Sequence, residues 1–253
     1  MSQADVAITR IMVALDTSAR SSAALDTAAE LAGALGAQLL GLFVEDINLL
    51  RLAGLPFARE VGRASAAARP LDFSEVERAM RMEAARAERS IAGAAQRLQL
   101  QWSFRVTRGQ MIAQVLAEAQ QVDMVVLGRA GEYATPGVGP VLVLFDGSPT
   151  ARQALATAAR LAKANERQLG VLIPADTTES FQQQRGLAAA SVGHGAPRMR
   201  YIALASSGVA HLARAAQAEK CSAFVLASAS LPLGAEEIGA LIHAIGCPVV
   251  LIK

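Results

Sequence analysis

The chain alternates short, unbroken apolar runs with longer segments in which apolar side chains recur at helical spacing. Met12–Ala32 begins with such a run, passes through a polar turn and continues with helical periodicity. Gln38–Val44 is a second apolar run, typical of a strand buried on both faces. Alternation of this kind predicts an α/β fold with a parallel sheet, right-handed crossovers and helices on both sides.

The pattern occurs twice. Met12–Ala32 aligns without gaps on Leu142–Ala162 at an offset of 130, so that Asp16 falls on Asp146. Downstream the copies align again at an offset of 99, with Gly109 on Gly208. We therefore predict two tandem domains, residues 1–136 and 137–253, the second shorter by 31 residues between these two stretches.

The extra length of the first copy covers about residues 45–72. Its segment Leu49–Val61 mixes Leu and Phe with Arg, which suits a lid or a surface for a partner, or a helical excursion packed against its own domain. The helix that follows shows an S-x-x-E capping box, Ser74 to Glu77, at its start.

The second copy adds a helix at about Ala235–Ile245 and a strand at Pro248–Ile252. The first copy lacks both, because only Gly128–Pro140 separates its fourth strand from the next copy. We expect the two copies to pack together as a pseudo-dimer. We also expect Pro248–Ile252 to lie at a sheet edge, where it can pair with the same strand of a second chain to form a homodimer.

Composition indicates a cytoplasmic protein without a membrane span. No uncharged apolar stretch reaches the roughly 18–20 residues that cross a bilayer, and Met1–Arg10 does not resemble a signal peptide. Cys221 and Cys247 have apolar neighbours and no CxxC spacing, so they are predicted to be buried free thiols.

Several function classes are disfavoured. A net charge of +2 with only 4% aromatic residues gives no basic stripe with stacking residues, so we predict no nucleic-acid partner. His194, His211 and His243 stand apart from other ligands, so no metal site is predicted. The sequence also lacks a P-loop, a nucleophile elbow and any other catalytic constellation, and we predict no catalytic residues.

Two copies of a strand ending in Asp, followed by a helix and by a later strand that in the first copy reads VVLGRAG, resemble the universal stress protein family in its tandem form. The resemblance implies a doubly wound, Rossmann-like fold, similar to the adenine nucleotide alpha hydrolases. It also implies a site for ATP at the carboxyl ends of the strands. The family signature there is G-x2-G-x9-G-[ST].

The first copy keeps half of this signature. Gly128 and Gly131 provide G-x2-G, but Val141 and Leu142 stand where Gly-[Ser/Thr] is expected. The second copy keeps neither half. The resemblance thus implies a partial adenine nucleotide site. Its members are Asp16, Val44, Leu127, Gly128 and Gly131.

Each element of this site also has an ordinary structural interpretation. Asp16 suits a ribose or adenine contact, but equally a turn or helix N-cap. Gly128 and Gly131 suit a phosphate loop, but equally a turn in a Gly- and Pro-rich connector.

The leading hypothesis is a stress-response or regulatory binding module that binds ATP or AMP weakly in its first domain, needs no obligatory cofactor, and is at most a very weak ATPase. The alternative is a pseudo-dimeric interaction scaffold that binds no nucleotide. The sequence identifies neither the partner protein nor the stress signal.

Overall fold

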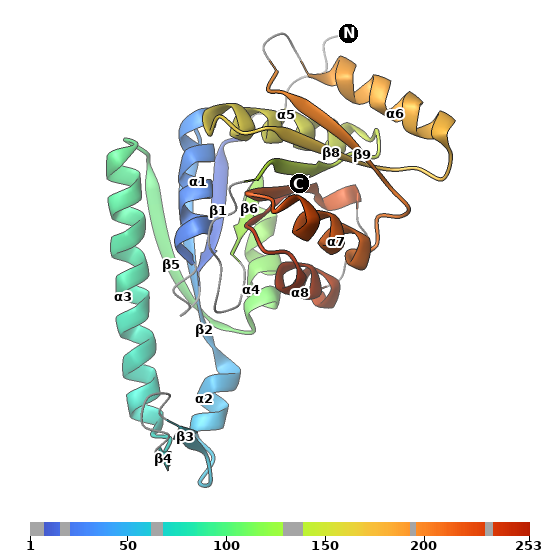
Figure 1. Ribbon diagram of the computed structural model, residues 1–253. Helices are drawn as coiled ribbons and strands as arrows, with labels where there is room; N and C mark the ends of the chain where they lie inside the picture. The colour runs from blue at the N-terminus through green and yellow to red at the C-terminus, as the bar shows by residue number, and fades with distance from the viewer. Residues whose placement is uncertain (1–7, 16–20, 62–67, 129–138, 193–195, 231–234) are drawn as a thin grey trace.

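The computed structural model describes residues 8–15, 21–61, 68–128, 139–192, 196–230 and 235–253 (Figure 1). Strands and helices alternate along both halves, as predicted. The first half contains β1 (Arg10–Leu15), α1 (Ser21–Leu35), β2 (Gln38–Asp46), α2 (Ile47–Ala53), β3 (Arg59–Val61), β4 (Ala68–Pro70), α3 (Phe73–Arg97), β5 (Trp102–Gly109), α4 (Met111–Glu118), the 3-10 turn η1 (Ala119–Gln121) and β6 (Met124–Leu127). The second half contains β7 (Val141–Leu144), α5 (Pro149–Ala164), β8 (Leu169–Pro174), α6 (Thr178–Ser191), β9 (Met199–Leu204), α7 (Val209–Glu219), β10 (Ala223–Ala227), the 3-10 turn η2 (Ser228–Ser230), α8 (Ala235–Ala244) and β11 (Val249–Ile252).

One sheet runs through both halves. Its nine described strands lie in the order β5-β2-β1-β6-β11-β10-β7-β8-β9. On either side of β11 the copies therefore repeat one order, outward from the centre: fourth, first, second and third strand. All neighbours are parallel except β11 and β6, which are antiparallel. The predicted α/β fold with a mostly parallel sheet is confirmed.

The prediction that the last strand lies at a sheet edge is wrong. Val250 of β11 pairs with Val225 of β10 on one side and with Val126 of β6 on the other. In the described part of the first copy no fifth strand follows β6, so β6 has an open edge that β11 fills. Both sides of β11 are thus paired within the chain, and β11 offers no free edge to a second chain.

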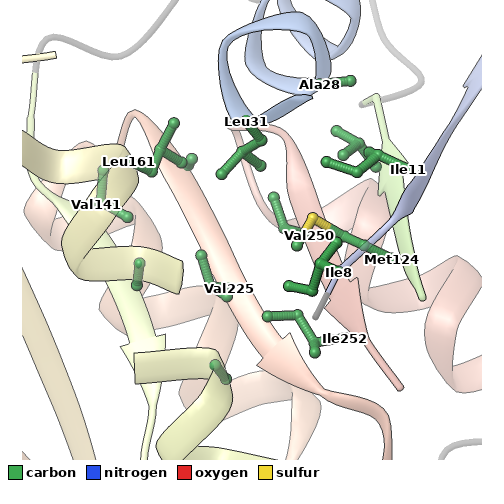
Figure 2. Packing of buried hydrophobic residues seen from close by; sticks show 14 of the residues in the cluster. Ile8, Ile11, Ala28, Leu31, Met124, Val141, Leu161, Val225, Val250 and Ile252 are labelled. Atoms are coloured by element: carbon green, nitrogen blue, oxygen red, sulfur yellow. The ribbon is translucent and has the colours of Figure 1, made fainter. Parts of the chain in front are cut away.

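Helices cover both faces of the sheet, which explains the unbroken apolar strands. Ile11 and Val13 of β1 point into a core beneath α1 and α5, whereas Met12 and Ala14 point into a second core beneath α4 and α8. The first core is continuous across the two halves. Figure 2 shows residues of both halves close together in it, namely Leu31, Met124, Leu161, Val225, Val250 and Ile252.

The 31-residue excess forms an arm, defined here as α2, the β3–β4 hairpin and the first turns of α3. It leaves the sheet at the carboxyl end of β2 and projects beyond the sheet (Figure 1). Leu50 and Ala53 of α2 pack on Val76 and Met80 of α3 in a small core of their own. Part of the predicted excursion thus packs within its own half, while residues 62–67 lie outside the described ranges.

The start of α3 differs from the predicted capping box. The N-cap is Asp72, not Ser74: its carboxylate accepts hydrogen bonds from the backbone N–H groups of Ser74 (2.8 Å) and Glu75 (3.1 Å). The hydrogen bond from the Ser74 hydroxyl is the main reason why the pKa of Asp72 lies below its ordinary value. Glu77 instead pairs with Arg81, one helical turn later.

The prediction of two free thiols is also wrong. Cys221 and Cys247 form a disulfide with their Cα atoms 6.1 Å apart. Each precedes a strand, β10 and β11 respectively, and these strands are parallel neighbours whose starts lie side by side. The two cysteines therefore no longer support a reducing compartment, because stable disulfides are rare in the cytosol.

A carboxylate fixes the start of β1 to the turn before β6. Asp123 Oδ2 accepts hydrogen bonds from the Thr9 N–H (2.8 Å), the Thr9 hydroxyl (2.9 Å) and the Arg10 N–H (3.0 Å). Partial burial acts to raise the pKa of Asp123, but these donors together outweigh it and the pKa lies below its ordinary value.

We expect Asp123→Asn to lower the free energy of unfolding at neutral pH by about 1 kcal/mol, because an amide accepts these bonds less well than a carboxylate. A carboxyl whose pKa is depressed by folding stabilises the protein above its unfolded pKa, about 3.9, and loses that contribution as pH falls through the folded pKa. The difference between wild type and variant should therefore shrink below about pH 4. Urea denaturation of both proteins from neutral to acid pH measures it; a constant difference would contradict the assignment.

Candidate functional site

The strand ends on which the predicted site depends lie next to one another. Ala14 of β1 is paired with Leu127, the last residue of β6, and Leu15 is paired with Phe43 of β2. Val44 follows Phe43 and extends one residue beyond the described end of β1. The carboxyl ends of β2, β1 and β6 thus lie side by side at one end of the sheet. Open parallel sheets bind their ligands at this end of the strands.

Three of the five predicted site residues can be placed there. Val44 and Leu127 are buried, and their side chains belong to the core beneath α4. Only their backbone groups can therefore meet a ligand at these strand ends. Gly128 directly follows β6 and is partly exposed. The other two, Asp16 and Gly131, lie outside the described residues.

The structure explains why the first copy lacks the Gly-[Ser/Thr] half of the signature. Val141 and Leu142, which occupy its expected place in the sequence, are buried in β7. In the sheet, β11 and β10 separate β7 from β6. These two residues therefore build the core of the second half and contribute nothing to the edge beside Gly128.

Sequence reasoning missed a polar cluster at the base of the arm. Arg108 of β5 donates to Glu45 Oε2 of β2 through Nε (2.9 Å) and Nη2 (2.8 Å), and Nη2 also reaches Glu77 Oε1 of α3 at 3.4 Å. Glu45 is buried, and its hydrogen bond raises the pKa of Arg108 further above the ordinary arginine value. The sequence signal that could have revealed this cluster is Glu45, an acid that directly follows the apolar run Gln38–Val44. The cluster ties β2, β5 and α3 together where the arm begins.

In the second half, the equivalent turn uses its polar groups internally. Asp146 Oδ1 accepts the Ser148 N–H at 2.9 Å, and Ser148 Oγ caps α5 by accepting the Ala151 N–H at 3.1 Å. Gly147 has a φ of +82°, and a Cβ there would stand 2.6 Å from the side-chain oxygen of Gln184 on α6. This turn, closely covered by α6, offers little room for a ligand.

A separate cavity of about 400 Å³ lies at the junction of the two halves. It adjoins Met124 at the amino end of β6, opposite to the end that carries Leu127. Its walls are mainly apolar and come from α4, α8 and β11, including Val115, Ile238 and Leu251. No sequence signal pointed to it, because it forms only where β11 meets β6.

No metal centre is seen at these places. Within the ranges that the structure describes, no three His, Cys, Asp or Glu side chains come together in a way that could hold a metal ion. His194 lies outside those ranges. No described helix is both long and apolar enough to cross a membrane.

The sequence profile of the universal stress protein family matches residues 7–139, just over half of the chain. The chain belongs to the universal stress protein family. The match covers the first copy and ends just before β7. Among curated proteins, no sequence matches the chain.

Solved universal stress proteins share the fold over nearly the full length. One from Archaeoglobus fulgidus DSM 4304 has 12% identity and a TM-score of 0.55, with 96% of this chain and 98% of the other covered. A protein assigned to the same family, from Pseudomonas aeruginosa UCBPP-PA14, has 15% identity and a TM-score of 0.51, with 99% and 95% covered. At these identities the likeness establishes the fold alone.

Proposed function

We propose that this universal stress protein is a regulatory binding module whose amino-terminal half holds an adenine nucleotide weakly. The observation that carries the proposal is the adjacency of the carboxyl ends of β1, β2 and β6, which brings Val44, Leu127 and Gly128 to one edge. There the backbone of Val44 and Leu127 would meet the nucleoside, Asp16 the ribose or adenine, and Gly128 and Gly131 the first phosphate.

The affinity is expected to be low. Efficient phosphate binding uses the backbone N–H groups of a helix N-terminus, and the helix that would follow a complete signature has no counterpart after β6 in the described residues. Among the described residues at these strand ends, none is placed to orient water or to neutralise a leaving phosphate, and the proposal is binding without catalytic turnover. We further propose that the protein acts in the cytoplasm, where ATP is abundant, and the disulfide between Cys221 and Cys247 would then be an exception to the rule for that compartment.

Equilibrium binding of ATP, AMP and cAMP to the purified protein tests the proposal. We expect saturable binding of at least one nucleotide in the millimolar range, and about tenfold weaker binding for Asp16→Ala, the loss of a charged hydrogen bond. Asp146→Ala is the matched control, because it removes the equivalent carboxylate of the second copy, and it should leave the affinity unchanged.

The outcomes separate the function from the site. Absence of saturable binding to wild type would remove the nucleotide proposal and favour the scaffold that binds no nucleotide. Binding that survives both Asp16→Ala and Gly131→Val would keep the function and overturn this site. Binding that is weakened by Asp146→Ala alone would move the site to the second half.

A further inference from the structure

The strand β5 forms one edge of the nine-stranded sheet. It pairs with β2, and no described strand lies on its other side. Figure 1 shows β5 and the other edge strand, β9, on opposite sides of the molecule. β5 is eight residues long. An edge of this length presents a row of backbone N–H and C=O groups that can pair with another extended chain.

The pairing with β2 fixes which backbone groups of β5 point outward. The Leu39 N–H donates to the Gln101 carbonyl at 2.9 Å, so Gln101 and every second residue after it face β2. The residues between them point their N–H and C=O groups away from the sheet. These outward residues are Trp102, Phe104, Val106 and Arg108.

Two apolar side chains of the outward residues are exposed. Phe104 packs inward, because it and Ile91 of α3 both lie against Gly41 of β2. Trp102 and Val106 lie two residues before and after Phe104, on the same face of the strand, and are 40% and 46% exposed. The helix α3 therefore does not reach over the outer side of β5.

β5 lacks the features that usually keep an edge strand from pairing. Such features include proline, lysine, a bulge or a very short strand. β5 contains neither Pro nor Lys, and its pairing with β2 runs without a bulge from Trp102 to Gly109. Its two arginines form ion pairs within their own half, Arg105 with Glu118 and Arg108 with Glu45. The edge is open to another strand.

The equivalent edge of the second half is covered differently. The offset of 99 places Trp102 on Tyr201 of β9. Tyr201 is partly buried, and the guanidinium of Arg185 on α6 lies 5.3 Å from the centre of its ring. β9 is also shorter, with six residues. The second half thus covers the aromatic side chain of its edge itself, whereas the first half leaves Trp102 exposed.

The sequence of β5 is complementary to itself when two copies run antiparallel. In such a pair the hydrogen-bonded positions are outward residues of both strands. With a two-fold axis at Phe104, Trp102 of each copy lies opposite Val106 of the other, and Ser103 lies opposite Arg105. An aromatic side chain opposite a β-branched one is a favourable cross-strand pair. Each exposed apolar side chain of the edge then covers the other.

Other registers fit less well. An axis at Arg105 would place two arginines opposite each other, which is unfavourable. An axis at Val106 would place Arg108 opposite Phe104, and an axis at Ser103 would pair only the first turn of the strand, Trp102–Phe104. Antiparallel pairing also has a precedent in this chain, because β6 and β11 join the two halves in the same way.

We propose that two copies of the chain form a dimer by antiparallel pairing of β5, with the two-fold axis at Phe104. The sheet then continues from one chain into the other. About six backbone hydrogen bonds cross the junction, two for each hydrogen-bonded pair of residues. The dimer involves neither β11 nor the strand ends proposed to hold a nucleotide.

Light scattering of the full chain after size exclusion, over a range of protein concentrations, tests the proposal. We expect the mass to rise from that of one chain to twice that mass and no further, because the two-fold axis closes the assembly. Trp102 gives an independent readout. Its emission should shift to the blue over the same range of concentration, as Val106 of the other copy covers it.

Val106→Pro removes an outward N–H and leaves the hydrogen bonds to β2 intact. Each dimer loses two hydrogen bonds, so dimerisation should weaken by about tenfold or more. Ala203→Pro is the matched control, because Ala203 is an exposed, outward residue of β9 at the position equivalent to Phe104. It should dimerise like wild type, and circular dichroism should show that both variants fold.

A charge pair tests the register. Trp102→Lys and Val106→Glu should each weaken the dimer, because each removes an apolar partner across the two-fold axis. The double variant Trp102→Lys/Val106→Glu places a lysine opposite a glutamate in both pairs, so it should dimerise more tightly than either single variant.

Four results would overturn the proposal. One is a wild-type monomer at every concentration. Another is a dimer that Val106→Pro leaves unchanged or that Ala203→Pro disrupts. The third is growth beyond a dimer, which would mean that β5 pairs with a different surface. The fourth is a double variant that dimerises no better than its single variants, which would exclude the axis at Phe104.

Discussion

Replacing Cys221 and Cys247 together with alanine should lower the free energy of unfolding by about 3.5 kcal/mol. The disulfide closes a segment with a sequence separation of 26 residues, and a cross-link over such a length restricts the unfolded chain by about that amount. Both side chains are buried, so the alanine variant also loses some packing. Urea denaturation of the oxidised wild type and of the double variant, followed by circular dichroism, measures the difference.

Reduction provides the internal control for this prediction. A thiol reductant should destabilise the wild type by a similar amount and leave the alanine variant unaffected. If the reductant changes neither protein, the two cysteines are free thiols in the native state, and the original interpretation of the sequence would be restored.

Ile252→Ala should lower the free energy of unfolding by about 3 kcal/mol. Ile252 is fully buried in β11, between Ala227 of β10 and Met124 of β6. Its removal leaves a cavity in the core that the two halves share. Because β11 pairs with both halves, we expect the amino-terminal half to lose stability together with the carboxyl-terminal half.

The only tryptophan of the chain reports this coupling. Trp102 lies in β5 at the far edge of the amino-terminal half. In Ile252→Ala, its fluorescence transition in urea should move to lower denaturant by the same amount as the circular dichroism transition. Leu172→Ala, a buried change in β8 of the other half, should shift both probes together as well. A Trp102 transition that stays at its wild-type midpoint would mean that the halves unfold independently.

The order of elements was predictable because apolar periodicity reports burial directly. The fourth strand of the first copy was expected to end at Leu127, and β6 does end there. The place of β11 was not predicted, because its apolar run indicates burial on both faces but does not identify the neighbouring strands. To place β11, one would also have had to know that β6 lacks a neighbouring strand on one side.

Short-range polar choices were harder to predict. Asp72 and Ser74 both stand three residues before a glutamate, so either could be the N-cap of α3. Asp72 is the N-cap because its carboxylate accepts hydrogen bonds from both the Ser74 and the Glu75 N–H groups. Apolar surroundings are typical of free thiols and of disulfides alike. The two cysteines form a disulfide because they precede adjacent parallel strands, whose starts lie side by side.

The candidate site was predictable only in part. The sequence indicated which strand ends carry Val44, Leu127 and Gly128, and the sheet brings those ends together. The closed turn at Gly147 was not predictable, since the covering side chain, Gln184, comes from a helix that the local sequence does not connect to it. The apolar side chains of the arm were visible in the sequence as Leu and Phe among arginines, but which of them are exposed depends on which face of α2 meets α3.

The shared position of β11 also has a consequence for synthesis. Chains are made from the amino terminus and domains generally fold as they emerge, but the strand that completes the first half of this sheet belongs to the last part of the second. Until Ile252 has left the ribosome, β6 retains an open backbone edge above an uncovered apolar core. The first half is therefore synthesised first, but its sheet is completed only when β11 has been synthesised. Throughout translation the open edge of β6 needs protection from other nascent chains.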